Sequence, residues 1–151
     1  MTAFPPPDPD FERKVRESFA RQAAMATLGA RMVRVAPGEV DLALPFRADL
    51  TQQHGFLHGG VVTAVLDSAC GYAALSLMPA GTAVLTVELK VNLVAPARGE
   101  RFLARGRVVR PGRTLMVCAG EVVAEGPGAE RTVAILQGTM MALRDREGLA
   151  D

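Results

Sequence analysis

The sequence has little of what several kinds of site require. It contains two cysteines, which form no CxxC pair, and only two histidines, His54 and His58. These counts argue against a disulfide framework and against a metal centre built by the protein, so we expect no metal ion and no separate cofactor. Cys70 and Cys118 both lie in apolar surroundings, and we expect them to be reduced core residues.

An excess of charge of one sign is also missing. The chain has 17 basic and 16 acidic residues and a net charge of +1. This balance gives no electrostatic reason to expect nucleic acid or an anionic membrane surface as a partner. No run of about 18 uninterrupted apolar residues is present, and the first residues lack the basic and apolar regions of a signal peptide. We therefore expect a cytoplasmic protein that does not insert into membranes.

What the sequence does contain is enough apolar material for one core. It has 151 residues, of which 49% are hydrophobic and 22% are charged. These values are typical of a single globular domain. We expect a leader over residues 1–9, one domain over residues 10–143 and a tail over residues 144–151.

Two segments have helical patterns. Apolar residues recur every four positions from Phe11 to Ala23, which predicts a short amphipathic helix that ends near Gly29. Residues 59–77 are rich in alanine and leucine and are apolar on nearly every face. A helix of that kind has to be surrounded by other structure.

The other regular segments have the patterns of strands. Six runs are predicted to be strands, at residues 31–36, 39–45, 85–93, 100–110, 114–125 and 131–143. The first two form a hairpin through Pro37 and Gly38. Because no helix separates the last four, we expect an antiparallel meander. The fold class is therefore α+β, with one long helix wrapped by a curved, mostly antiparallel sheet of about six strands.

His58-Gly59-Gly60 lies where a polar loop meets the apolar helix. The first amides of a helix have no internal partner and carry a partial positive charge. Such a helix start suits an oxyanion, for example the one that forms when a thioester carbonyl is attacked. The two glycines are equally consistent with a tight turn into the helix and nothing more.

Asp67 lies in the most apolar stretch of the chain, where an unpaired carboxylate is costly. It either pairs with structural donors or acts as a catalytic base or nucleophile. Along a helix, it is roughly 10–13 Å from the helix start, whereas a catalytic carboxylate has to come within about 3 Å of its proton partner. If two copies of the chain face each other in antiparallel orientation, the helix start of each copy lies opposite Asp67 of the other. The distance within one helix then no longer matters. The sequence therefore predicts a two-fold dimer with two shared sites.

A family resemblance rests on these same residues. Residues 52–69, with His58-Gly59-Gly60 and an acidic residue nine positions after the histidine, resemble the PaaI-like branch of the hotdog thioesterases. Three later blocks, at residues 85–92, 95–99 and 112–115, extend the resemblance over about residues 10–143. The resemblance implies the hotdog fold, dimerisation through the sheets and often a dimer of dimers. It also implies metal-free hydrolysis of acyl-CoA thioesters, in which coenzyme A is part of the substrate.

The resemblance also implies catalytic roles. Asp67 is the general base or nucleophile, and the Gly60 amide, with Gly59 beside it, polarises the thioester carbonyl. His58 is an orienting residue near that carbonyl. The alternative is that His58 is a turn histidine hydrogen-bonded to the backbone. Two positions differ from relatives but keep the chemistry in kind. Gln52 stands where many have asparagine, and Thr86 where some have serine.

Substrate contacts are implied at two other places. The aliphatic side chains of Val61, Val62, Val65 and Leu85 are expected to line an acyl pocket, although they do not set its length. The pantetheine arm and the phosphates are expected along the turn that contains Arg110, Gly112, Arg113 and Thr114. Arginine suits phosphate because its planar group donates two hydrogen bonds at once. A solvated turn arginine is the alternative.

The leading hypothesis is a thioesterase that acts on aryl- or medium-chain acyl-CoA. A non-catalytic acyl-CoA-binding hotdog protein, a sensor or carrier, is the main alternative and predicts binding without turnover. A hotdog dehydratase or hydratase needs a catalytic histidine in another local pattern, and neither His54 nor His58 lies in one.

Overall fold

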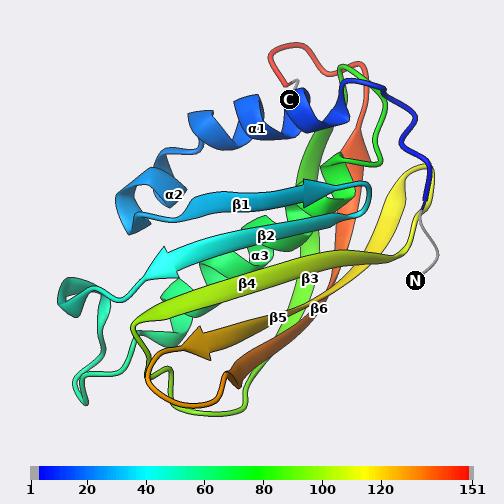
Figure 1. Ribbon diagram of the computed structural model, residues 1–151. Helices are drawn as coiled ribbons and strands as arrows, with labels where there is room; N and C mark the ends of the chain where they lie inside the picture. Colours follow the sequence, from blue (N-terminus) through cyan, green and yellow to red (C-terminus); the bar gives the residue numbers. More distant parts are fainter. Residues whose placement is uncertain (1–3, 150–151) are drawn as a thin grey trace.

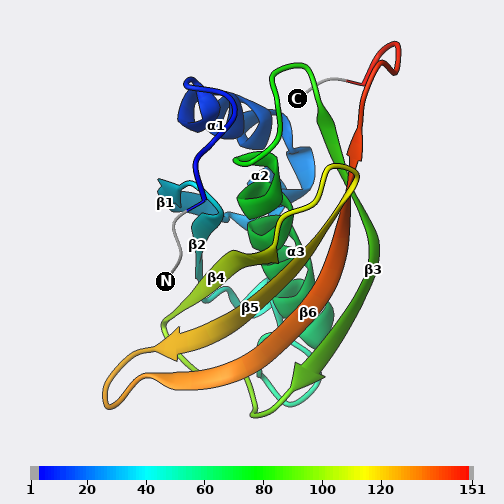
Figure 2. The same cartoon turned by 90° about the vertical axis from the view of Figure 1, so that its right-hand side faces the viewer.

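One antiparallel sheet of six strands curves around a long helix in the computed structural model, which describes residues 4–149 (Figures 1 and 2). The helix is α3 (Gly59–Leu75). The strands are β1 (Arg31–Ala36), β2 (Glu39–Pro45), β3 (Ala83–Leu93), β4 (Arg101–Arg110), β5 (Leu115–Glu125) and β6 (Arg131–Leu143). The expected α+β arrangement is confirmed. Residues 1–3 of the expected leader and 150–151 of the expected tail lie outside the described residues.

The apolar helix α3 fills the concave side of the sheet. Leu66, Ala69 and Ala73 are fully buried there. Gly106 of β4 lets the helix approach closely, because a Cβ at this position would lie 2.4 Å from the backbone carbon of Ala69. The all-round apolar pattern of the sequence thus corresponds to a helix enclosed by strands.

The end of α3 was expected at residue 77 but lies at Leu75. The hydroxyl of Ser76 donates to the Ala73 carbonyl at 2.6 Å and accepts from the Gly38 amide at 2.7 Å. This fully buried serine ties the last turn of the helix to the β1–β2 hairpin, and the helix stops there.

The order of the strands corrects the expected four-strand meander. The sheet runs β1-β2-β4-β5-β6-β3, so only β4, β5 and β6 form a meander. β3 lies at the far edge and pairs with β6, from Ala83 opposite Leu143 to Leu93 opposite Ala134. Alternation of apolar and polar residues identifies a strand but not its partner. As a result, β3 is an open edge, on which Leu85, Val87 and Leu93 are each about half exposed.

The N-terminal helix is also different from the expectation. Instead of one helix ending near Gly29, the chain forms α1 (Phe11–Arg21) and α2 (Ala23–Leu28). The break is at Gln22, whose backbone is extended, with ψ of 91°. Gln22 ends α1 by donating its amide to the Phe19 carbonyl, and its own carbonyl accepts from Met25 and begins α2.

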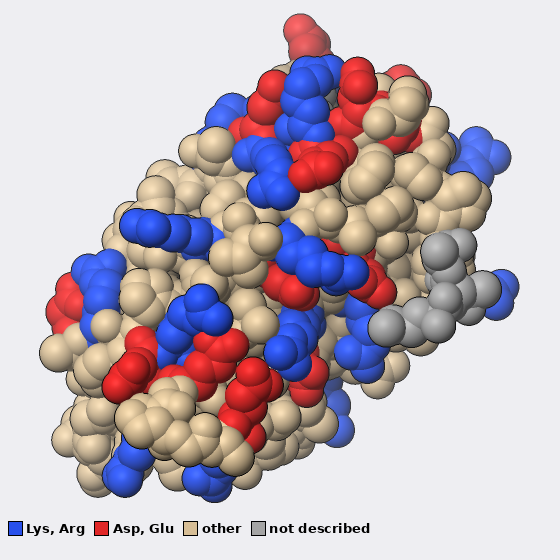
Figure 3. Space-filling view, in the orientation of Figure 1, with Lys and Arg blue, Asp and Glu red and all other residues tan. Residues whose placement is uncertain are grey.

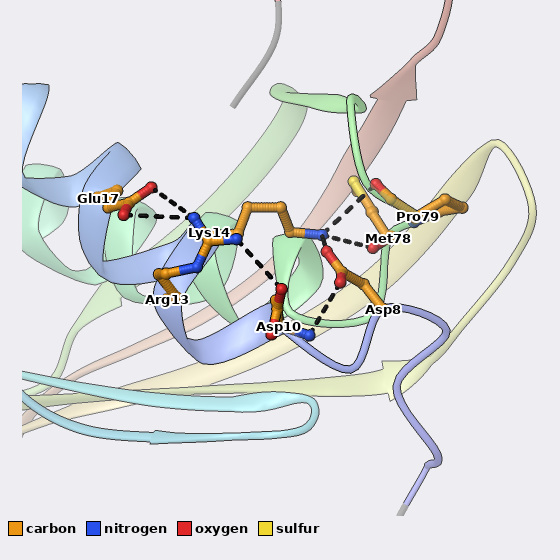
Figure 4. Close-up of polar contacts among 7 residues, drawn as sticks. All are labelled: Asp8, Asp10, Arg13, Lys14, Glu17, Met78 and Pro79. Carbon is orange, nitrogen blue, oxygen red and sulfur yellow. Dashed lines mark hydrogen bonds and ion pairs between the residues drawn. The ribbon is translucent and has the colours of Figure 1, made fainter.

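A buried ion pair fixes α1 to the end of α3 (Figure 4). The Lys14 ammonium lies 3.1 Å from the Asp8 carboxylate and donates to the Met78 carbonyl at 2.6 Å. Both charged side chains are less than a tenth exposed, so removing either would leave an uncompensated buried charge. We call Asp8, Lys14 and Met78 the clasp. It holds the N-terminal helices over one end of the molecule.

The surface carries mixed charge. Figure 3 shows basic and acidic side chains next to one another over the face seen in Figure 1. Arg34 pairs with Glu39 and Arg105 pairs with Glu121 on the outer side of the sheet. None of the helices within residues 4–149 is long and apolar enough to cross a membrane.

Candidate active site

Asp67 lies in the middle of α3, next to the edge strand β3. The Thr86 hydroxyl donates to Asp67 Oδ1 at 2.8 Å. Asp67 is partly buried, and this burial raises the pKa of its carboxyl group, while the hydrogen bond from Thr86 lowers that pKa. The structure therefore brings together two of the expected catalytic residues and leaves the second carboxylate oxygen for a reactant.

A cavity of about 310 Å³ opens beside Asp67. Part of its wall comes from α3 and β3, where sequence reasoning placed Asp67 and Thr86 at the site but did not name Ser68, Gly71, Tyr72 or Val84. The rest comes from the N-terminal helices, through Ser18, Arg21 and Gln22. Sequence reasoning missed these three, because no local pattern links α1 to a helix almost 50 residues later. The complete lining is Ser18, Arg21, Gln22, Asp67, Ser68, Gly71, Tyr72, Val84 and Thr86.

The start of α3 has a different arrangement. His58 caps the helix, and its Nδ1 accepts a hydrogen bond from the Gly60 amide at 2.9 Å. In the free chain His58 thus has the alternative role named above, that of a turn histidine bonded to the backbone. The Gly60 amide, expected to bind the oxyanion, is already engaged by this imidazole.

A second cavity of about 450 Å³ lies at this helix start. Gly59 is part of its wall, and a Cβ there would lie 2.5 Å from Leu93 Cδ1, so a larger residue would require the half-exposed Leu93 side chain to move. Gln52 is also in the wall, where its side-chain oxygen accepts from the His54 amide and shapes the loop. The lining residues are Gln52, Phe56, Leu57, Gly59, Val62, Leu93, Val94, Ala95, Pro96, Ala97 and Val133.

The two cavities have no lining residue in common. Asp67 and Thr86 belong to the first, and Gln52 and Gly59 to the second. Of the expected acyl-lining residues, Val62 lines the second cavity. The other three line neither cavity: Val65 is buried, Val61 packs against the core and Leu85 is exposed on β3. Within one chain, the expected catalytic residues are therefore divided between two places.

The expected phosphate-binding turn joins β4 to β5. Arg110 and Arg113 are exposed, and neither forms an ion pair with any residue in the described range 4–149. Gly112 is needed for the turn, since a Cβ there would lie 2.2 Å from the Leu115 carbonyl oxygen. The Thr114 carbonyl accepts from the Ala142 amide at 2.8 Å. The structure adds Arg144, whose guanidinium donates to the Arg113 carbonyl at 2.9 Å.

The cysteines and possible metal ligands lie apart from this chemistry. Cys70 and Cys118 are buried and free, as expected, and burial raises the pKa of the Cys118 thiol to about 12. Among residues 4–149, no three His, Cys, Asp or Glu side chains are grouped so that they could share a metal ion.

Comparison with known proteins decides the family. Residues 54–130 match the sequence profile described as the thioesterase superfamily. The chain belongs to this superfamily. The matched range begins at His54 and includes the start of α3, Asp67 and Thr86, so the family features coincide with both halves of the site.

Individual relatives extend the match to nearly the whole chain. A Silicibacter pomeroyi thioesterase family protein of known structure is 57% identical, with a TM-score of 0.87 over 89% of this chain and 98% of that one. A Halobacterium salinarum protein, provisionally named an esterase, is 35% identical over 96% of this chain and 99% of its own length. Human acyl-coenzyme A thioesterase 13 is 26% identical over 64% of this chain and 69% of its own length.

The fold is that of the PaaI-like hotdog thioesterases. The Escherichia coli PaaI protein superposes with a TM-score of 0.80 over 93% of this chain and 96% of its own length, at 20% identity. The expected family and the hotdog fold are thus confirmed. The protein is an enzyme of the thioester hydrolase class, and its family acts on acyl-CoA and is typically oligomeric.

Proposed function

We propose that the enzyme hydrolyses aryl- or medium-chain acyl-CoA to the free acid and coenzyme A, with Asp67 as general base or nucleophile. One observation carries the proposal: a partly buried carboxylate with a raised pKa faces a cavity and is held by a single hydroxyl. A carboxylate in such surroundings is a stronger base than one in water.

The reaction needs little beyond this carboxylate. As a base, Asp67 takes a proton from water while the water oxygen bonds to the thioester carbon. The C–S bond then breaks, and the proton passes to the coenzyme A thiolate. As a nucleophile, Asp67 bonds to the thioester carbon and the C–S bond breaks, so that a mixed anhydride forms and the coenzyme A thiolate leaves. Water then cleaves the anhydride to the free acid and the Asp67 carboxylate, and the released proton passes to the thiolate. In both routes Thr86 fixes one carboxylate oxygen and leaves the other to react. We propose no metal ion or bound cofactor, because these groups supply the base and the amides supply the oxyanion site.

The Gly60 amide is proposed as the oxyanion donor. It points out of the first turn of α3, where no backbone carbonyl is available to it. In the free chain it donates to His58 Nδ1, so the thioester oxygen has to replace the imidazole. This exchange gives His58 an orienting role: it holds the amide in line until substrate arrives. Gln52, in the same cavity wall as Gly59, is proposed to hold water on that side.

A second copy of the chain is proposed to complete each site. The two cavities of one chain are separate, and the strand beside Asp67 is an open edge with exposed apolar side chains. An uncovered apolar edge strand invites pairing with another strand. Antiparallel pairing of two β3 edges joins the sheets and sets Asp67 of each chain opposite the other's helix start. Val109, Leu115 and Ile135, exposed on the outer face, are proposed to hold two dimers together.

Coenzyme A is proposed to lie along the β4–β5 turn, with Arg110 and Arg113 at its phosphates. Their lack of acidic partners among the described residues supports this role. Arg144 joins them through its contact with Arg113. Two free cysteines support a reducing compartment, for which we propose the cytoplasm.

The test is an assay of thiol release across aryl-, short-, medium- and long-chain acyl-CoA. We expect turnover that is highest for aryl or medium-chain substrates. Absence of thiol release across the whole panel, with the protein folded, would contradict the proposed function.

A further inference from the structure

The proposed reaction leaves one side of the Asp67 cavity without a role. The N-terminal helices contribute Ser18, Arg21 and Gln22 to this side, and α3 contributes Ser68 and Tyr72. All five side chains carry hydrogen-bonding groups. Four of them form two hydrogen-bonded pairs, Ser18 with Tyr72 and Ser68 with Gln22. The fifth, Arg21, is charged, and an alkyl group that covered it would remove its water without compensation.

Contacts between α1 and α3 hold part of the polar wall in place. Phe19 of α1 packs against Tyr72 of α3, with ring centroids 5.6 Å apart in an edge-to-face arrangement. The Ser18 hydroxyl lies 3.4 Å from the Tyr72 hydroxyl. Val15, also on α1, is fully buried. The clasp shown in Figure 4 fixes the preceding turn of α1. Groups held in place in this way bind a ligand without first having to be ordered.

The break between α1 and α2 belongs to the same wall. Gln22 lies at the break, and its side-chain oxygen accepts from the Ser68 hydroxyl at 3.3 Å. The same side chain carries an amide nitrogen, which is a donor only. The interruption of the helix thus places a hydrogen-bonding side chain against Ser68 of α3, the residue next to Asp67.

Arg21 differs from the other basic residues of α1. Arg13, Lys14 and Arg16 each pair with an acidic side chain of the leader or of α1 itself. Within residues 4–149, Arg21 has no acidic partner, although it lines the cavity. Nor does its charge serve Asp67, since burial raises the pKa of that carboxyl group and only the Thr86 hydrogen bond opposes the rise.

We infer that the Asp67 cavity binds the far end of an acyl group that terminates in a carboxylate, with Arg21 as its counter-ion and Gln22 as a hydrogen-bond donor. This inference rests on the proposed function. A guanidinium matches a carboxylate with two parallel hydrogen bonds. It also offsets the repulsion between a second carboxylate and Asp67. The cavity volume of about 310 Å³ lies at the small end of ligand sites, which suits a short to medium chain.

The experiment compares two substrates with six-carbon acyl groups: hexanoyl-CoA, which ends in a methyl group, and adipyl-CoA, which ends in a carboxylate. The measured quantity is the ratio of kcat/KM for adipyl-CoA to that for hexanoyl-CoA. We expect the unaltered enzyme to favour adipyl-CoA. Arg21→Gln is expected to lower the ratio about 10- to 100-fold, because a hydrogen-bonded charge pair is lost. Arg16→Gln is the matched control, since Arg16 lies on the same helix and pairs with Glu12. It is expected to keep the ratio.

The outcomes separate this inference from the proposed function. Turnover of hexanoyl-CoA with a ratio that Arg21→Gln does not change overturns the carboxylate inference and leaves the thioesterase proposal intact. An equal loss of the ratio in Arg16→Gln also overturns it, because a general charge effect would then explain both. Lack of thiol release from either substrate, and from the rest of the acyl-CoA panel, overturns both proposals.

Discussion

The beginning and the middle of α3 are opposite environments on one helix. At the beginning, the His58 imidazole accepts a hydrogen bond from the Gly60 amide beside a mostly apolar cavity. In the middle, Asp67 is a charged group in a cavity whose wall is largely polar. The first place offers aligned amides and no carboxylate, and the His58 imidazole there accepts from the Gly60 amide. The second offers a base and no amides, because amides inside a helix are used by the helix itself. Hydrolysis of a thioester needs both, so the comparison favours a site formed by two chains.

The largest effect on kcat is expected when the base is removed. Asp67→Asn keeps the shape of the side chain and an acceptor for Thr86, and should lower kcat about 10²- to 10⁴-fold. Burial raises the pKa of Asp67 in the folded protein above its value in the unfolded chain, about 3.9. The protonated carboxyl group therefore stabilises the fold below about pH 3.9, and this contribution is lost as pH rises through the folded pKa. Asp67→Asn should therefore raise the melting temperature at pH 7 and leave it almost unchanged at pH 3.

Asp41 provides the control for this variant. It is also partly buried with a raised pKa, but it lies on the outer side of the sheet, away from both cavities. Asp41→Asn should keep kcat. Equal losses of activity in the two variants would show that a general effect of buried charge, not a base at residue 67, is being measured.

A smaller effect is expected at the beginning of the helix. Gly60→Pro removes the proposed donor, and proline is tolerated in the first turn. We expect a loss in kcat of about 10²- to 10³-fold, typical of a missing oxyanion donor. His58→Ala removes the same cap hydrogen bond from the side of the acceptor, at a cost of about 1 kcal/mol in stability, but leaves the Gly60 amide in place. It should lower kcat less than Gly60→Pro does. If His58→Ala is the more damaging change, the imidazole rather than the amide acts on the carbonyl.

The smallest expected effect concerns the pKa of the base. Thr86→Val removes the hydrogen bond that lowers the pKa of Asp67, so the acid limb of the profile of kcat/KM against pH should move to higher pH. Thr139→Val removes a similar hydroxyl-to-carboxylate bond, to Glu88 at 2.6 Å, on neighbouring strands. That variant should keep the wild-type profile. A shift of the same size in both would contradict a specific role for Thr86.

Local patterns predicted most of the fold, because they depend on the period of apolar residues. The strand at residues 131–143 and the enclosed helix α3 follow from alternation and from all-round apolarity. The edge position of β3 did not follow, since any of the later strands could have paired with it by pattern alone. Its position depends on which strands close around α3, a property of the whole sheet.

In the site, too, local patterns predicted some residues and missed those that are brought in by contacts between distant segments. Asp67 and Thr86 were expected together, and their hydrogen bond confirms that they meet. Arg21 and Gln22 were not expected there, because the amphipathic pattern of residues 11–29 gave no sign of the break at Gln22. The clasp and the contact between Phe19 and Tyr72 bring α1 to the cavity. Such contacts join residues that are far apart in the sequence, so no local pattern reveals them.

The most direct test of a shared site mixes two inactive variants. Chains with Asp67→Asn and chains with Gly60→Pro are combined, and the mixed dimers are isolated through two different tags. In a mixed dimer one site contains both alterations and the other contains none, so we predict about half the thiol release of the unaltered dimer. Mixed dimers that are as inactive as either parent, with exchange of chains verified, would contradict the account and place the whole reaction within one chain.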